Sequence, residues 1–285
     1  MVGRQTAGKA RNFCERLLLE STMTHPRCTA PFAWLLASTV LFQPLASIAA
    51  CTAVSGPKAA ALIELYTSEG CSSCPPADAQ LSRLKQTLDP GADYVPLSLH
   101  VNYWDYIGWK DPYAQDMFGT RHRWLVQANK HTAVVTPHFF VGGVESREWP
   151  GELRTLVREQ NSQPAQATVR IEGHSVKPGV VSLKADAQLL GAHPRSGLYL
   201  ALSESKLVSK VGRGENAGAT LAHDNVVRAW LGPVALNSGK GVVQQDVLLD
   251  PTWSASRLTV VAFVQDQDTG QVLQATSATG CASTP

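Results

Sequence analysis

The chain has 285 residues, a formal net charge of +2 and a hydrophobic share of 44%. That share supports a packed core and excludes a mainly disordered chain. The charge is close to neutral, and no run of Lys and Arg alternates with aromatic residues, so we expect no nucleic-acid partner. The length allows one large domain or two ordinary ones.

Residues 1–50 have the features of a targeting segment. Residues 32–50 are mostly apolar and uncharged, and Arg27 lies shortly before them, as in the first part of a signal peptide. Met23 suits the start of such a peptide, which makes residues 1–22 an upstream extension. A permanent N-terminal membrane anchor is the alternative. The sequence therefore predicts a secreted or periplasmic protein.

The cysteines near the end of this segment leave two interpretations open. Ile48-Ala-Ala-Cys51 resembles a bacterial lipobox, in which Cys51 is lipidated and anchors the protein to a membrane. In an ordinary cleavage site, Ile48 and Ala50 instead occupy the −3 and −1 positions, and Cys51 stays free to form a disulfide. After removal of the segment, an oxidising compartment favours the pairs Cys71–Cys74 and Cys51–Cys281. Lipidation of Cys51 excludes the second pair.

The first part of the mature chain predicts alternating strands and helices. An apolar strand is bounded by Pro57 and by the polar segment that begins at Thr67, and a helix starting with two prolines follows the first Cys pair. This order is typical of an α/β domain. We expect strands at 59–66, 94–101 and within 133–143, and helices at 75–88, 112–128 and from Trp149.

The second part predicts a different architecture. Residues 162–167 have the composition of a linker, and short alternating segments separated by Gly, Pro, Asn and Asp follow. This pattern indicates an antiparallel sandwich or barrel. We therefore expect a thioredoxin-like α/β domain at 51–163 and an all-β sandwich-like domain at 164–285. The expected strands are 168–172, 180–189, 197–203, 242–249, 257–265 and 271–276.

Cys71-Ser-Ser-Cys74 carries the chemistry of the chain. Two cysteines three residues apart, between a buried strand and a helix, can close a small reversible disulfide. The helix N-terminus favours a thiolate at the first cysteine and lowers its pKa. Cys71 is then the exposed attacking thiol and Cys74 the resolving thiol. A purely structural disulfide is the alternative.

Metal binding by this pair is a weaker hypothesis. No second pair of Cys or His ligands stands at a spacing that would complete a zinc site, so we expect no cofactor. His138 lies one residue after a Thr-Pro pair that the fold can bring near the two cysteines. Cys71, Cys74 and His138 would suit copper, which leaves a copper chaperone as an alternative function.

Three motifs carry a resemblance to a known family. They are residues 64–78, His100-Val-Asn-Tyr-Trp-Asp-Tyr-Ile-Gly-Trp-Lys-Asp-Pro-Tyr113, and Thr136-Pro137. The chain resembles the thioredoxin superfamily, and more closely the secreted bacterial proteins named domain of unknown function 1223. That family has no established activity. The resemblance implies a cis peptide bond at Pro137, with Pro137 facing the dithiol and the Thr136 backbone offered to an extended substrate.

The same resemblance suggests a role for Glu64. Thioredoxins place a buried acid in this strand one residue closer to the first cysteine, so Glu64 would accept protons during the attack by Cys74. A carboxylate bonded to nearby backbone is the alternative. The sequence departs from thioredoxins at Glu69-Gly70, where a tryptophan usually precedes the first cysteine, and in its long segment between Cys74 and Pro137.

Two further segments have both a functional and a structural interpretation. Trp104 and Trp109, with Tyr103 and Tyr106, would form a substrate groove over the dithiol or would pack as core. Residues 212–228 contain His223, Asp224 and Arg228, which would line a site or belong to a loop fixed by its own hydrogen bonds; the second interpretation is favoured.

We expect an extracytoplasmic protein that exchanges disulfides with protein thiols or disulfides through Cys71 and Cys74. The non-enzymatic alternative is a binding or assembly protein in which this disulfide is structural.

Overall fold

A computed structural model describes residues 50–193 and 195–282 of the chain, and the expected targeting segment lies outside them except for its last residue. The described part contains four α-helices and fourteen β-strands. None of its helices is long and apolar enough to cross a membrane.

The first half alternates strands and helices, as its sequence pattern predicts. The expected helix at 75–88 is divided at Arg83 into two short helices, and the expected strand–turn–strand at 133–143 has its regular strands only from His138 onward. The elements are β1 (Ala50–Val54), β2 (Ala61–Thr67), α1 (Pro75–Ser82), α2 (Leu84–Thr87), β3 (Tyr94–His100), α3 (Asp116–Ala128), β4 (His138–Val141), β5 (Val144–Ser146) and α4 (Trp149–Ser162).

The second half consists of strands joined by turns. Two of them, β9 and β10, form a separate antiparallel pair that the sequence pattern did not predict. The strands are β6 (Ala167–Lys177), β7 (Val180–Leu189), β8 (Ser196–Glu204), β9 (Leu207–Lys210), β10 (Thr220–His223), β11 (Val226–Ala235), β12 (Lys240–Leu248), β13 (Leu258–Asp266) and β14 (Val272–Thr279).

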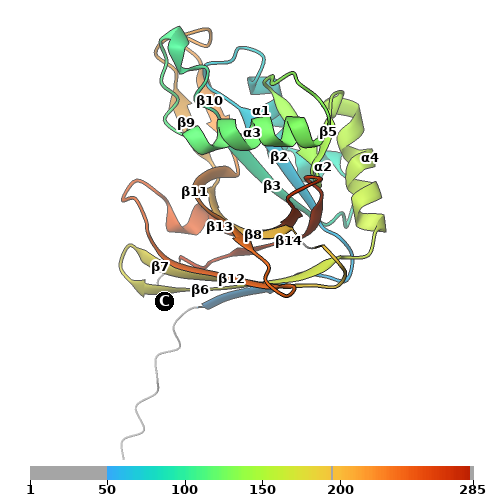
Figure 1. Ribbon diagram of the computed structural model, residues 1–285. Coiled ribbons are helices and arrows are strands. Elements are labelled where there is room, and N and C mark those ends of the chain that lie inside the picture. The colour runs from blue at the N-terminus through green and yellow to red at the C-terminus, as the bar shows by residue number, and fades with distance from the viewer. Residues whose placement is uncertain (1–49, 194, 283–285) are drawn as a thin grey trace, which may run out of the picture. The chain divides into compact units, whose positions relative to one another are not determined.

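The expected fold class, a thioredoxin-like α/β domain followed by a β-sandwich-like domain, is wrong. An eight-stranded sheet with the order β14-β13-β8-β11-β3-β2-β4-β5 joins strands from both halves of the chain (Figure 1). The junction is the parallel pairing of β11 with β3, where Val226 lies opposite Ser98. The described chain is mostly β-sheet. The first-half strands do not close a sheet of their own but continue one built from second-half strands.

The expected domain boundary at residues 163 and 164 falls between α4 and β6. Both large sheets, however, contain strands from before and from after this boundary. Strand β1, from the first half, is the edge of the four-stranded sheet β1-β6-β7-β12. Its residues 50–54 pair antiparallel with residues 170–174 of β6.

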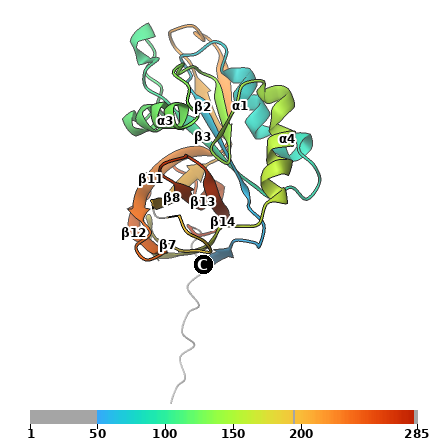
Figure 2. The same ribbon diagram turned by 45° about the vertical axis from the view of Figure 1, so that its right-hand side comes forward.

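Three hydrophobic cores hold these layers together. One lies between the four-stranded sheet and the β8, β13 and β14 end of the large sheet (Figure 2). The other two lie on opposite faces of β2, because successive side chains of a strand point to opposite faces. Leu62 and Tyr66 pack with α3, and Ile63 and Leu65 pack with α1 and α4. Strand β2 is therefore fully buried and directs the chain to the cysteine pair that follows it.

Candidate functional site

Cys71 and Cys74 form a disulfide at the start of α1. Cys74 is the N-cap residue of this helix, and its carbonyl oxygen accepts the backbone N–H groups of Ala77 and Asp78. Pro75 and Pro76 fit this position because a proline in the first turn lacks only an N–H that would have no helical partner. Ser72 and Ser73, between the cysteines, are exposed.

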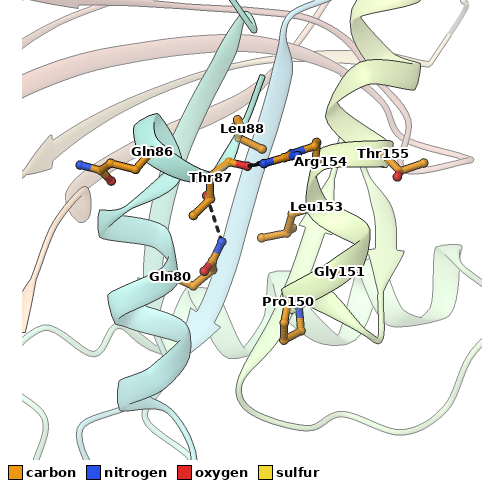
Figure 3. Close-up of a pocket in the computed structure, with 9 residues that line it drawn as sticks. All are labelled: Gln80, Gln86, Thr87, Leu88, Pro150, Gly151, Leu153, Arg154 and Thr155. Atoms are coloured by element: carbon orange, nitrogen blue, oxygen red, sulfur yellow. Dashed lines mark hydrogen bonds between the residues drawn. The ribbon is translucent and has the colours of Figure 1, made fainter. Parts of the chain in front are cut away.

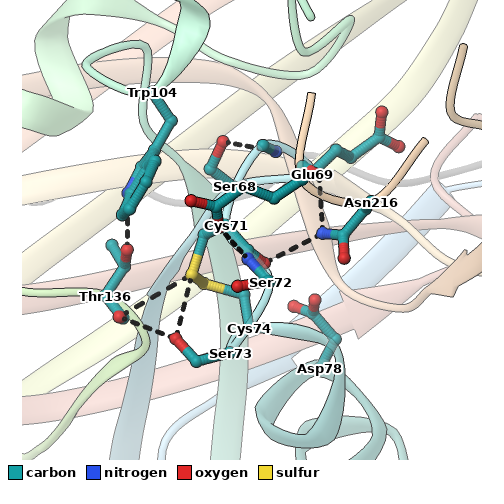
Figure 4. The surroundings of a disulfide bond; sticks show 12 residues. Ser68, Glu69, Cys71, Ser72, Ser73, Cys74, Asp78, Trp104, Thr136 and Asn216 are labelled. Atoms are coloured by element: carbon teal, nitrogen blue, oxygen red, sulfur yellow. Dashed lines mark hydrogen bonds between the residues drawn. A yellow bond between two sulfur atoms is a disulfide. The ribbon is translucent and has the colours of Figure 1, made fainter. Parts of the chain in front are cut away.

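The disulfide itself is covered. Both cysteine residues are 0% exposed, so the expectation that Cys71 is an exposed thiol is wrong for this oxidised form. Figure 4 shows the surrounding groups: Trp104 and Thr136 on one side and Asn216 on the other. A partner can reach the sulfur atoms only if one of these covering groups moves.

Thr136 and Pro137 form one wall of the site. The peptide bond between them is cis, and Cys71 Sγ lies 3.7 Å from the carbonyl oxygen of Thr136. The Ser73 hydroxyl donates to the same carbonyl oxygen at 3.4 Å. The indole N–H of Trp104 donates to Thr136 Oγ1 at 2.7 Å, which fixes the ring beside the disulfide (Figure 4).

The other wall comes from the second half of the chain. The side-chain amide of Asn216 donates to the carbonyl oxygens of Glu69 and Cys71, both at 2.9 Å. The backbone N–H of Ser72 donates to Glu215 Oε2 at 3.0 Å. We name residues 212–219 the covering loop. The segment is fixed partly by hydrogen bonds of its own, as the favoured interpretation expects, but it also bonds the cysteine motif directly, which that interpretation did not include.

Two hollows flank the backbone that leads to Thr136. One of about 340 Å³ is lined by Tyr103, Trp104, Tyr106, Val134, Val135 and Thr136. A second of about 340 Å³ lies toward Pro137, His138 and Trp149. Tyr106 is 82% exposed, so this ring is available for contact with another molecule. Trp104 lies between the disulfide and the first hollow and also packs against the core that contains Leu62 and Tyr66, so its position agrees with both interpretations.

Trp109 lies elsewhere and supports a buried acid. Its indole N–H donates to Glu69 Oε2 at 2.8 Å, and the other oxygen of Glu69 lies 3.2 Å from His223 Nε2. Within the described residues, Trp109 lines neither of the two hollows beside Thr136. Its role is to fix Glu69 rather than to form the groove.

The carboxylate of Glu64 is bonded to Arg121 and not to the disulfide. It accepts two hydrogen bonds from Arg121, at 2.7 and 3.0 Å, and one from the Tyr66 hydroxyl at 3.2 Å. The guanidinium is surrounded by four aromatic rings at 4.9–5.5 Å, those of Trp124, Tyr199, Trp230 and Phe263. Glu64 is thus a buried partner of Arg121, and the geometry offers no support for the proton-accepting role.

His138 is also committed to other partners. Its Nδ1 lies 2.8 Å from His122 Nε2, and its Nε2 lies 2.8 Å from Glu145 Oε1. Both ring nitrogens are therefore occupied, and neither is free to join Cys71 and Cys74 around copper. Burial is the main cause of a lowered pKa at His138, although the hydrogen bond to Glu145 opposes it.

The sequence interpretation missed Asp78, and it did not predict that Asp111 is buried and pairs with His100. Asp78 follows Cys74 by one helical turn and is buried, which raises its pKa despite the nearby imidazoles of His100 and His223. Burial alone would lower the pKa of His100, but the adjacent carboxylate of Asp111, at 2.7 Å from Nδ1, raises it. A helix start followed by an acid at the fourth residue was the only sequence signal for Asp78.

The second disulfide joins Cys51 to Cys281, as one of the two interpretations predicts. It ties β1 to the turn after β14, and Gly173 of β6 lies against it, where an added Cβ would meet Cys51 Sγ at 3.0 Å. In this structure the Cys51 thiol is therefore not available for lipidation. Two disulfides in one chain are typical of a protein outside the reducing cytoplasm.

A further hollow of about 450 Å³ lies between α1, α2 and the start of α4. Arg154 closes one side by donating twice to the carbonyl oxygen of Thr87, and Gln80 donates to the Thr87 hydroxyl (Figure 3). Its lining holds no cysteine, histidine or carboxylate, so we assign it no chemistry.

Residues 62–265 match the family described as protein of unknown function (DUF1223). The chain belongs to this family. It is similar in structure to a protein from Agrobacterium tumefaciens, with 20% identity, a TM-score of 0.56 and coverage of 79% of this chain and 96% of that one. It is also similar to HBP35 of Porphyromonas gingivalis, with 17% identity, a TM-score of 0.60 and coverage of 78% and 76%.

These two likenesses concern the fold alone. No curated protein matches the chain. The matches confirm the closer of the two resemblances drawn from the sequence, but they do not confirm the broader one to the thioredoxin superfamily.

Proposed function

We propose that this protein exchanges disulfides with a polypeptide partner outside the cytoplasm, through Cys71 and Cys74. The observation that carries the proposal is the position of the disulfide at the N-terminus of α1, 3.7 Å from the Thr136 carbonyl and next to an aromatic hollow. The start of a helix stabilises a thiolate, which makes a cysteine there a good leaving group and a reactive nucleophile.

The exchange proceeds in two displacements. A thiolate of the partner attacks Cys71 Sγ, the bond to Cys74 breaks, and Cys74 leaves as a thiolate. A second partner thiolate then attacks the partner's sulfur in the mixed disulfide, and Cys71 leaves as a thiolate. The partner loses two electrons and gains a disulfide, while the protein becomes a dithiol; the reverse sequence reduces a partner.

The partner segment has a place beside the disulfide. The residues before Pro137 belong to no strand, and Val135 is 51% exposed between the two hollows. A polypeptide lying along this segment would bring its own cysteine to Cys71 and its apolar side chains to Trp104 and Tyr106. Aromatic side chains of this kind contribute strongly to binding.

Trapping of the mixed disulfide tests the proposal. With a peptide that contains one disulfide as the probe, reduced Cys74→Ser protein should accumulate a stable adduct through Cys71, because the resolving thiol is absent. Reduced Cys71→Ser protein is the matched control and should accumulate little adduct, because Cys74, the N-cap residue of α1, is the resolving and not the attacking thiol in the proposed exchange. Equal adduct formation by both variants, or none by either, would contradict the assignment.

A structural disulfide is the second candidate function. The observation that favours it is the complete burial of both cysteine residues. In that case the chain would be a binding or assembly protein, and loss of the disulfide would lower stability without removing a reaction.

The proposed cellular location rests on the two disulfides. A protein that exchanges disulfides works in an oxidising compartment, so we place it in the periplasm or outside the cell. The bond between Cys51 and Cys281 favours the form without a lipid on Cys51.

A further inference from the structure

Three buried side chains from distant parts of the chain meet beside the cysteine pair. Asp78 of α1, His100 at the end of β3 and His223 at the end of β10 each place one oxygen or nitrogen atom within 4.8 Å of the others. Their exposed fractions are 6%, 0% and 2%. None of the sequence motifs brings these three residues together.

The three side chains leave unpaired polar atoms in the interior. Asp78 Oδ1, His100 Nε2 and His223 Nδ1 are buried and have no hydrogen bond of good geometry among the described residues. The Thr67 hydroxyl is a neighbour of Asp78 and acts to lower the pKa of that carboxyl, but it too is without a hydrogen bond of good geometry. Buried polar atoms are nearly always paired, and an unpaired one is costly. Three such atoms, each on a different element of one cluster, therefore call for a common partner.

The hydrogen bonds on the far side of each ring fix which nitrogen faces the cluster. His100 Nδ1 lies 2.7 Å from Asp111 Oδ2, so in the neutral ring Nδ1 carries the proton and the lone pair is on Nε2. His223 Nε2 lies 3.2 Å from Glu69 Oε1, so Nδ1 likewise presents its lone pair. A carboxylate that orients the outer nitrogen of a histidine is the usual arrangement around a protein-bound metal ion.

These carboxylates are themselves held in place. The backbone N–H of Glu69 donates to Asp111 Oδ2 at 2.9 Å, and the backbone N–H of Tyr113 donates to Asp111 Oδ1 at 2.9 Å. Trp109 donates to the remaining oxygen of Glu69. The carboxylates of Asp111 and Glu69 thus have hydrogen-bond partners of their own and hold the two imidazole rings in place. On each ring, only the nitrogen that faces the cluster has no partner among the described residues.

A cation between these atoms would pair all three of them. The lone pair of His223 Nδ1 is directed at Asp78, whose Oδ2 lies 3.8 Å away, too far for a hydrogen bond. The cluster also buries the carboxylates of Asp78, Glu69 and Asp111 with only two imidazoles. A divalent cation would pair the three inward atoms and offset this excess of negative charge.

We propose that Asp78, His100 and His223 bind a divalent metal ion such as Zn²⁺, which is the ion used in the experiment below. Two imidazole nitrogens and one carboxylate oxygen form a donor set that zinc accepts, with a fourth position left for water. Tetrahedral zinc with bonds of about 2.1 Å holds its donor atoms about 3.4 Å apart, so the cluster contracts slightly on binding. The cysteines are not part of this site.

The experiment titrates purified protein with Zn²⁺ after treatment with a chelator, with both disulfides kept oxidised so that thiolates cannot contribute. We expect one ion per chain by calorimetry and metal analysis. Asp78→Asn and His223→Gln should each weaken binding at least tenfold, and His174→Gln, which changes an exposed histidine of β6, should leave it unchanged. Asp111→Asn should weaken binding by about 10–100-fold, since it removes only the group that orients His100.

Circular dichroism of each variant shows whether it is folded, so that only folded proteins are compared. If a histidine variant fails to fold, Asp78→Asn, which keeps the shape of the side chain, still tests the site. Visible absorption of bound Co²⁺ gives a second readout of the histidine and carboxylate donors. The proposal is overturned if oxidised wild-type protein binds no zinc, or if folded Asp78→Asn binds zinc as tightly as the wild type.

Discussion

The side-chain amide of Asn216 donates a hydrogen bond to the carbonyl oxygen of Cys71 at 2.9 Å, across 145 residues of sequence. Through this bond and the one to Glu69, the covering loop holds the cysteine motif in its buried position. One side of the disulfide is therefore covered by a segment from the other half of the chain (Figure 4).

We expect Asn216→Ala to increase the rate at which a small thiol reduces the Cys71–Cys74 disulfide. The substitution removes two hydrogen bonds of the covering loop, so the loop opens more often. Mass mapping of alkylated cysteines over time measures the rate for each disulfide separately. Asn237→Ala, at an exposed turn, is the control, and equal reduction rates in both variants would show that the loop does not limit access.

The Cys51–Cys281 disulfide should contribute strongly to stability. It connects residues separated by 230 positions, and closing a long loop restricts the unfolded chain. We expect Cys51→Ser with Cys281→Ser to lower the free energy of unfolding by about 2–5 kcal/mol. Urea unfolding measures the change, and Cys71→Ser with Cys74→Ser, which opens a far shorter loop, should cost less. A larger loss in the second double variant would contradict this assignment of roles.

The ion pair of Glu64 with Arg121 should matter for folding and not for exchange. Removing one partner of a buried pair leaves the other unpaired, so Glu64→Gln should lower the free energy of unfolding by about 3–5 kcal/mol. The exposed pair of Arg158 with Asp89 is the control, and Arg158→Met should cost less than about 1 kcal/mol. If folded Glu64→Gln protein showed a shifted pH profile of disulfide exchange, Glu64 would be a proton acceptor after all.

His122 should make the protein sensitive to mild acid. Burial, then the neighbouring His138 and Arg123, lower its pKa to about 3, whereas a histidine in the unfolded chain titrates near about 6.5. Between these values the unfolded state binds the proton and the folded state does not. The stability contribution is thus complete above about pH 6.5 and is lost as the pH falls toward 3, by up to about 1.4 kcal/mol per pH unit.

We expect His122→Gln to flatten this loss relative to the wild type. Urea unfolding at several pH values between 7 and 4 measures the slope, and His174→Gln provides a control at an exposed position. An unchanged slope in His122→Gln would mean that His122 is protonated in the folded protein.

The local elements of this fold could be predicted from sequence, but their assembly could not. Strand β2, the cysteine pair and the helix beginning at Pro75 follow from an apolar run, a turn and two prolines. The sheet that joins β3 to β11 rests on contacts across more than a hundred residues, for which periodicity carries no signal. Expectations based on separate domains failed at that junction.

The candidate site shows the same limit. Cys71, Cys74 and the cis bond before Pro137 are local features with recognisable motifs. Asn216 and His223 reach the site only because the covering loop and β10 lie beside the cysteine motif and α1. The sequence singled out the segment that contains them but offered no reason to place it beside the cysteines.

The reduction potential of the Cys71–Cys74 disulfide shows whether this bond can take part in exchange. Equilibration of the whole protein with glutathione or dithiothreitol buffers, followed by alkylation and mass mapping, gives the value for this bond alone. If the bond takes part in exchange, its potential should lie above about −300 mV, in the range of exchangeable disulfides. A potential below about −300 mV would identify a structural disulfide and contradict the proposed function.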